Sequence, residues 1–140
     1  MKKILSMILV VVLAMCSATS AFSQELETPV DEEIDLQYEY TVSVSSTLSI
    51  SSNVASCKST VIGMSGVTTK IYITQTLQVL DGNRWRRVTS WSKTFTTSSC
   101  TFVNTYSGLN GGKYRVMTEA KVYSGTAYET IYAYSTTRTC

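Results

Sequence analysis

The sequence predicts an all-β protein built as an antiparallel sandwich of about seven strands. From residue 40 onward, apolar and polar residues alternate with a period of two, and no window repeats with the helical period. The alternating segments are short and are separated by Gly, Asn, Asp and Ser. Tyr114 follows Gly112 at the spacing of a tyrosine corner, whose hydroxyl bonds to upstream backbone. We therefore expect an immunoglobulin- or fibronectin-III-like β-sandwich in residues 40–140.

Each expected strand keeps its apolar side chains on one face and ends at a turn signal. The strongest hairpin signal is the Asp-Gly-Asn turn at residues 81–83. Beyond this turn, Trp85 and Val88 have opposite parity, which predicts a β-bulge near Arg87. The expected strands span residues 41–50, 54–62, 69–80, 84–96, 99–106, 113–123 and 127–135.

The register of the last hairpin is predicted from its charged residues. A three-residue loop at 124–126, with Gly125 in the left-handed region, sets Lys121 opposite Glu129 on the outer face. A two-residue Ser-Gly loop instead sets the Glu129 carboxylate opposite core-facing Ala120, where an unpaired charge is unfavourable. We therefore expect the three-residue loop.

Residues 1–23 have the pattern of a secretory signal peptide. Two lysines precede an apolar run at residues 4–15, which is too short to span a bilayer. The small residues that follow predict cleavage before Gln24, with cleavage after Ala21 as the near alternative. We therefore expect a secreted, extracellular protein that has no membrane segment once the signal is removed.

Two other interpretations of this N-terminal region stay open. The apolar run could remain uncleaved as an anchor. Cys16 at the end of the run could carry a lipid, although the residue before a lipidated cysteine is normally small and Met15 is not.

The two signs of charge are segregated along the chain. Residues 24–39 hold seven acidic residues and no Lys or Arg, whereas residues 40–140 hold ten basic and three acidic residues, a net of +7. We expect residues 24–39 to form an acidic, flexible leader, with an added edge strand at its end as the alternative. A further hypothesis is that the leader folds over the basic face and competes there with an anionic ligand.

Three cysteines remain after signal removal: Cys57, Cys100 and Cys140. An exported chain can form disulfides, and three cysteines allow one internal pair. A simple immunoglobulin order sets Cys57 opposite about Asn104, which is far from Cys100. Both Cys57–Cys100 and Cys57–Cys140 stay open as the expected pair.

The residue types present argue against catalysis and metal binding. The chain has no histidine, so His-dependent triads and the common zinc patterns are excluded. The domain's carboxylates are Asp81, explained by its turn, and Glu119 and Glu129, which are expected on an open sheet face. We therefore expect a non-enzymatic protein without a cofactor.

One strand combines basic and aromatic residues and is the candidate ligand surface. Such a combination can bind anionic polymers by charge and sugar rings by stacking. The alternative is that the tryptophans pack in the core and the arginines form a solvated face. Nucleic acid is not expected, because the mature chain has no net charge. The candidate residues are Arg84, Trp85, Arg86, Arg87, Trp91 and Lys93.

A set of ordered motifs resembles an uncharacterised family of small secreted proteins from Gram-positive bacteria. The resemblance implies an exported β-sandwich and brings no activity, substrate or catalytic residue. We expect a binding or interaction module at the cell surface, with a binder of anionic wall polymer or glycan as one alternative and a secreted inhibitor or antimicrobial-type effector as another. The motifs are Thr69–Gln78, Trp85, Ser90–Lys93, Gly112–Val116 and Val122–Gly125.

Overall fold

The fold is described from a computed structural model, which describes residues 38–140. The predicted signal peptide, its cleavage site and Cys16 lie outside the described residues, as does the leader up to residue 37. The described residues contain no helix that is long and apolar enough to cross a membrane.

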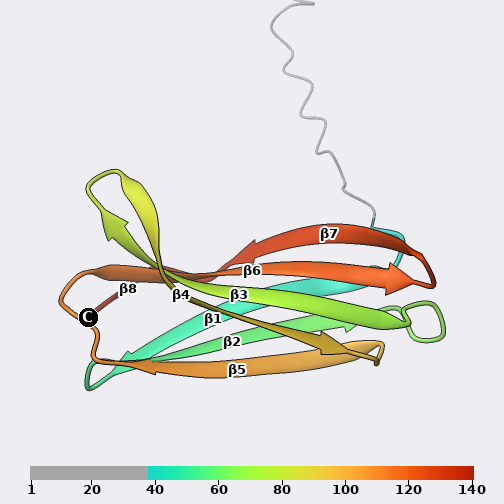
Figure 1. Cartoon of the computed structure of the whole chain (residues 1–140), viewed down its shortest axis with the longest axis horizontal. Helices are drawn as coiled ribbons and strands as arrows, with labels where there is room; N and C mark the ends of the chain where they lie inside the picture. Colours follow the sequence, from blue (N-terminus) through green and yellow to red (C-terminus); the bar gives the residue numbers. More distant parts are fainter. Residues whose placement is uncertain (1–37) are drawn as a thin grey trace, which may run out of the picture. The chain divides into compact units, whose positions relative to one another are not determined.

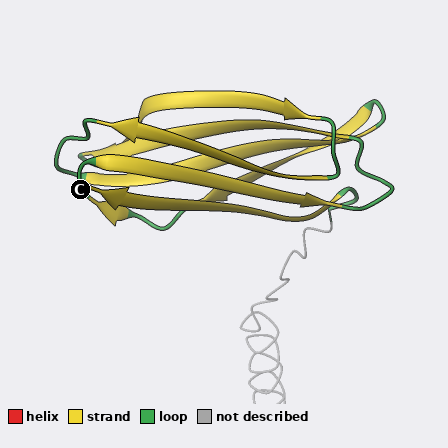
Figure 2. Ribbon diagram, turned by 90° about the horizontal axis from the view of Figure 1, so that it is seen from below, coloured by secondary structure: helices red, strands yellow, loops and turns green. Residues whose placement is uncertain are grey.

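Two antiparallel sheets pack face to face (Figures 1 and 2). Sheet A has the order β1-β2-β5 and sheet B the order β4-β3-β6-β7, with a short β8 paired to β6. Sheet A consists of β1 (Thr41–Ser51), β2 (Val54–Gly63) and β5 (Ser99–Ser107). Sheet B consists of β3 (Lys70–Asp81), β4 (Arg84–Phe95), β6 (Lys113–Ser124), β7 (Ala127–Tyr134) and β8 (Arg138–Thr139).

The strand order confirms the predicted fold class. The fourth strand pairs with the third in sheet B. In a constant-type immunoglobulin domain, the fourth strand instead joins the sheet of the first, second and fifth strands. This is the fibronectin-III-like form of the sandwich. The first seven strands lie within two residues of their predicted ends. β8 was not predicted, because two residues are too few to show an alternating pattern.

Three hairpins close through two-residue turns that match the right-handed twist of the strands. Ser52 and Asn53 between β1 and β2 have φ of 50° and 61°. Gly82 and Gly125 occupy the first turn position of the β3–β4 and β6–β7 hairpins, with φ of 62° and 65°. Positive φ at these positions is characteristic of the primed turns that hairpins prefer.

The predicted bulge lies in β4. Leu77 pairs with Thr89 and Gln78 pairs with Arg87, so Val88 is the extra residue. A bulge bends its strand and increases the local twist. Beyond it, the β3–β4 hairpin tip projects away from the sandwich (Figure 1).

The predicted three-residue loop of the last hairpin is wrong. Ser124 pairs with Ala127, so the loop is Gly125-Thr126 and Glu129 lies opposite core-facing Val122 rather than opposite Lys121. This register orients the Glu129 carboxylate inward, where three donors compensate it. It accepts hydrogen bonds from the backbone N–H groups of residues 39 and 40, both at 3.0 Å, and from the Thr41 hydroxyl at 2.6 Å. An inward carboxylate is tolerated here because it is hydrogen-bonded.

The core contains two apolar clusters, one toward each end of the sandwich. The corner cluster surrounds the tyrosine corner and the distal cluster lies toward the β6–β7 turn. Tyr38 and Tyr40 pack against the distal cluster. The corner cluster is Leu48, Ala55, Cys57, Leu77, Leu109, Tyr114 and Val116. The distal cluster is Val61, Ile71, Ile73, Ala120, Val122 and Ile131.

A belt of polar side chains separates the two clusters. Gln75 is fully buried and donates to the Ser59 hydroxyl at 2.8 Å, while Asn104 donates to the Gln75 carbonyl oxygen at 2.9 Å. Ser59 and Thr118 share a 2.6 Å hydrogen bond, and Thr118 donates to Ser46 at 3.0 Å. Within residues 38–140, no buried side-chain nitrogen or oxygen lacks a partner. The belt therefore joins both sheets without leaving an unsatisfied group.

Candidate functional site

The structure divides the six predicted ligand residues between the two faces of β4. Trp85 and Arg87 pair with Leu80 and Gln78, in the outward phase of sheet B. Arg86 and Trp91 have the opposite phase, and Trp91 packs against the corner cluster.

The remaining two predicted residues lie at the ends of the segment. Lys93 lies 5.0 Å from the ring centroid of its neighbour Phe95, and Arg84 is exposed at the turn. The six residues therefore do not form one surface.

The outward face of sheet B instead groups aromatic and cationic side chains from four strands. We call it the aromatic–cation face. At one end, the Arg115 guanidinium carbon lies 4.2 Å from the Trp85 ring centroid and 4.5 Å from that of Tyr134. Arg115 Nε also donates to Gln78 at 2.8 Å. The face comprises Lys70, Tyr72, Trp85, Arg87, Arg115, Lys121, Tyr123, Tyr128, Tyr132 and Tyr134.

The other end of this face repeats the combination of rings and cations. Lys70 Nζ lies 4.1 Å from the Tyr123 ring centroid, and the Tyr123 and Tyr128 rings are 5.1 Å apart. Cations near ring faces are attracted by the ring quadrupole, which orients both groups. Tyr128, Tyr132 and Tyr134 nevertheless expose 55%, 56% and 51% of their surface. Three large aromatic side chains of β7 are thus presented to solvent on this face.

The aromatic–cation face carries more cationic than anionic side chains. Glu119 is the one carboxylate in the outward phase of β6 and β7. The neighbouring hydroxyls of Ser92 and Thr74 lower the pKa of Tyr72, and Lys121 acts in the same direction. The same hydroxyls line the middle of the face, where Thr74 and Ser92 lie 3.2 Å apart.

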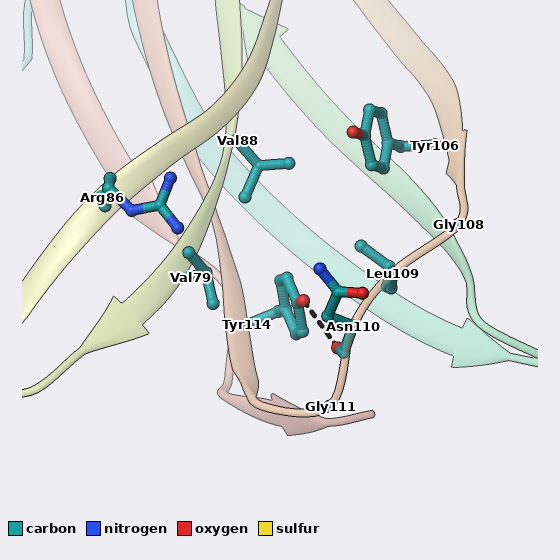
Figure 3. A pocket seen from close by; sticks show the side chains of 9 residues that line it. All are labelled: Val79, Arg86, Val88, Tyr106, Gly108, Leu109, Asn110, Gly111 and Tyr114. Atoms are coloured by element: carbon teal, nitrogen blue, oxygen red, sulfur yellow. Dashed lines mark hydrogen bonds between the residues drawn. The ribbon is translucent and has the colours of Figure 1, made fainter.

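A pocket of about 330 Å³ opens between the edge strands of the two sheets, at the tyrosine corner (Figure 3). The Tyr114 ring is buried there, and its hydroxyl donates to the Asn110 carbonyl at 2.7 Å. Gly112, which the sequence placed before this tyrosine, has φ of 156° and lies against Val79. Arg86 reaches the pocket from β4 because the bulge reverses the phase of the strand. The predicted ligand residue Arg86 therefore belongs to this second site.

The predicted disulfide is absent from the structure, where Cys57, Cys100 and Cys140 are all free thiols. Cys57 pairs with Asn104, as the sequence predicted, and lies four positions along the strand from Cys100, roughly 13 Å away. That separation exceeds the reach of a disulfide. Cys140 Sγ donates to the Asn53 side-chain oxygen at 3.3 Å and forms no disulfide with Cys57.

Burial makes the two strand cysteines poor nucleophiles. It raises the pKa of Cys57 and of Cys100 to about 11. Reactive thiols need a lowered pKa, so these two side chains act as small core residues. Among the described residues, no group of His, Cys, Asp and Glu side chains could hold a metal ion.

Sequence reasoning missed Arg115 and the tyrosines of β7. Their common parity in β7 was a usable signal, because Tyr128, Tyr132 and Tyr134 must share one face of a strand. Arg115 lies beside Trp85 only through the combined registers of β3, β4 and β6.

No protein-family model matches the chain, and a search of curated proteins returns no match. Membership of the family that the sequence resembles stays a prediction.

Proposed function

We propose that the chain is a secreted, non-enzymatic binding module that holds an anionic or neutral wall glycan on the aromatic–cation face of sheet B. The observation that carries the proposal is Arg115, held between the rings of Trp85 and Tyr134 on a face with three half-exposed tyrosines. The apolar run at residues 4–15 supports export.

The chemistry of the face suits a polymer better than a compact ligand. Ring faces stack on the apolar faces of sugars, and Tyr and Trp supply contact area with little loss of side-chain freedom. Lys70, Arg115 and Lys121 supply positive charge between the rings. A sheet face offers these groups along four strands, so an extended chain can contact several of them together.

The positions of the candidate nucleophiles and acids support a binding role. Glu129 faces inward, and both oxygens of its carboxylate accept hydrogen bonds from the chain. Glu119 therefore has no second carboxylate beside it on the outward face of β6 and β7. Cys57 and Cys100 stay protonated at neutral pH because burial raises each pKa to about 11. Binding alone requires none of these groups.

The test measures retention of the protein on purified Gram-positive cell wall, before and after its anionic polymers are extracted. We expect the double variant Tyr132→Ala/Tyr134→Ala to bind about tenfold more weakly, because two stacking rings are removed. The matched control is Thr101→Ala/Thr105→Ala, on the exposed outer phase of β5 in sheet A, and should bind like the wild type.

Two results would overturn the proposal. One is equal retention of the tyrosine double variant and its control. The other is no retention on wall together with a cross-linked protein partner, which would assign the face to protein recognition. Loss of binding after polymer extraction, with weakening at high salt, would identify the anionic polymer as the ligand. Unchanged binding after extraction would identify a neutral glycan.

A further inference from the structure

We infer that the pocket at the tyrosine corner is a second binding site, which takes a carboxylate joined to a compact apolar group. The pocket has a volume of about 330 Å³, at the lower end of the range for small-molecule sites. It lies at the edge between β4 and β5, on different residues from the aromatic–cation face. This inference goes beyond the proposed polymer binding and does not depend on it.

The pocket exists because of two local backbone features. The bulge at Val88 turns β4 away from β5 and brings Arg86 into the inward phase. On the opposite side, the segment from Gly108 to Gly111 forms a wall, with Gly108 at φ of 78°. Leu109 N–H donates to the Asn53 carbonyl at 3.0 Å, which fixes this wall to the β1–β2 turn. The pocket is therefore part of the native backbone geometry.

Apolar groups form the inner walls. Val79, Val88 and Leu109 line the pocket, and Val79 and Val88 pack against the corner cluster. The Tyr114 ring contributes a further surface, with its hydroxyl already engaged by Asn110. The lining as a whole exposes more polar than apolar surface, so a ligand that joins a small apolar part to a polar group fits the pocket better than a purely apolar one.

Three hydrogen-bond donors converge on the same space (Figure 3). The Arg86 guanidinium is turned toward Val79 and Val88, the Tyr106 hydroxyl points in from the opposite side, and the Asn110 carboxamide is directed in from the loop. No hydrogen bond within residues 38–140 uses the Tyr106 hydroxyl or the Asn110 carboxamide. No Asp or Glu lines the pocket. We therefore expect a ligand with acceptor oxygens, which the Arg86 guanidinium in particular requires.

The charge balance selects a monoanion. Arg86 is the single cation of the lining, and its Nε lies 3.7 Å from Asp81, with both side chains well exposed. A dianion would face a single cation, Arg86, which already lies beside the Asp81 carboxylate. A carboxylate matches the planar guanidinium, which binds it through two parallel hydrogen bonds.

The test is an NMR titration of the full chain with benzoate, followed through the backbone amides of Gly108, Leu109 and Gly111. We expect saturable shifts at these amides. Benzamide, the neutral isostere, should bind about tenfold more weakly, because hydrogen bonds to charged groups are the stronger ones. Arg86→Gln should weaken benzoate binding by a similar factor. Arg84→Gln, on the same strand outside the pocket, is the matched control and should bind like the wild type.

Three outcomes would overturn the inference: equal binding of benzoate and benzamide, unchanged binding by Arg86→Gln, or benzoate shifts confined to the aromatic–cation face. A peptide ending in a free phenylalanine carboxylate, compared with its C-terminal amide, distinguishes the source of the ligand. Tighter binding of the free peptide than of benzoate supports a peptide terminus. Tighter binding of benzoate supports a free organic acid.

Discussion

The two ends of the sandwich are closed in different ways. At the distal end, an inward carboxylate on β7 accepts three hydrogen bonds from the residues that lead into β1. At the corner end, the Tyr114 ring fills the core and bonds to a carbonyl four residues upstream. The distal carboxylate thereby ties the two sheets together, whereas the hydrogen bond of the tyrosine corner is local and a pocket remains beside it.

This difference separates a structural task from the binding that we propose. The Glu129 contacts join positions 88 to 90 residues apart in the sequence, so they hold the first strand onto the second sheet. The Tyr114 contact is local and leaves neighbouring donors uncommitted. A site that must admit a ligand is expected where closure is local and incomplete.

The largest expected effect concerns thiol reactivity. Because each pKa is raised to about 11, Cys57 and Cys100 hold about 0.1% thiolate at pH 8, roughly hundredfold less than a free cysteine. Alkylation at pH 8, mapped by mass spectrometry, should therefore modify Cys57 and Cys100 about hundredfold more slowly in the folded protein than in the denatured chain. Equal slow rates for Cys57 and Cys100 would show that both ends exclude solvent. Rapid modification of Cys57 would contradict the closed core at the corner end.

The next effect is on the distal end. Glu129→Ala removes the acceptor for two backbone N–H groups and one hydroxyl, and we expect a loss of about 3 kcal/mol in the free energy of unfolding. Chemical denaturation measures this change. Glu119→Ala, on the outward face of the neighbouring strand, is the control and should change stability by less than about 0.5 kcal/mol. Equal effects would show that the carboxylate does not close this end.

A smaller effect is expected at the belt between the ends. Gln75→Leu leaves Ser59 and Asn104 without their buried partner, which should reduce the free energy of unfolding by about 2 kcal/mol. Thr74→Val, the next residue along β3 but on the outward face, serves as the control. Denaturant midpoints compare the two variants, and a neutral Gln75→Leu variant would mean that the belt can be replaced by an apolar core.

The smallest effect is expected at the corner end. Tyr114→Phe keeps the buried ring and removes one neutral hydrogen bond to Asn110, so we expect a loss of about 1 kcal/mol. Tyr106→Phe removes a hydroxyl that bonds to no described residue and should be neutral. If thermal unfolding shows a larger loss for Tyr114→Phe than for Glu129→Ala, the contrast between the two ends is incorrect.

Local patterns predicted the strands, whereas contacts between distant residues escaped prediction. Alternation and turn residues located the seven main strands, and the parity change between Trp85 and Val88 located the bulge. The orientation of Glu129 was mispredicted because its donors come from residues 39–41, which no local rule places beside β7.

The candidate sites were predicted only in part, for the same reason. Trp85 and Arg86 were selected, but they belong to different sites because the two residues point to opposite faces of β4. Their true neighbours, Arg115 and Asn110, come from β6 and its preceding loop. The registers between β3, β4 and β6 determine which residues become neighbours on the sheet. No single segment of the sequence contains the information that sets these registers.

The bulge in β4 also affects the association of two copies of the molecule through their edge strands. β4 is an outer strand of sheet B, and an outer strand with regular pairing groups can template strand addition from another chain. The extra residue at Val88 interrupts that row of groups, and Arg84, Arg86, Arg87 and Lys93 give the strand a charge that repels an identical strand. The bulge that opens the pocket therefore also disfavours aggregation through the β4 edge of sheet B.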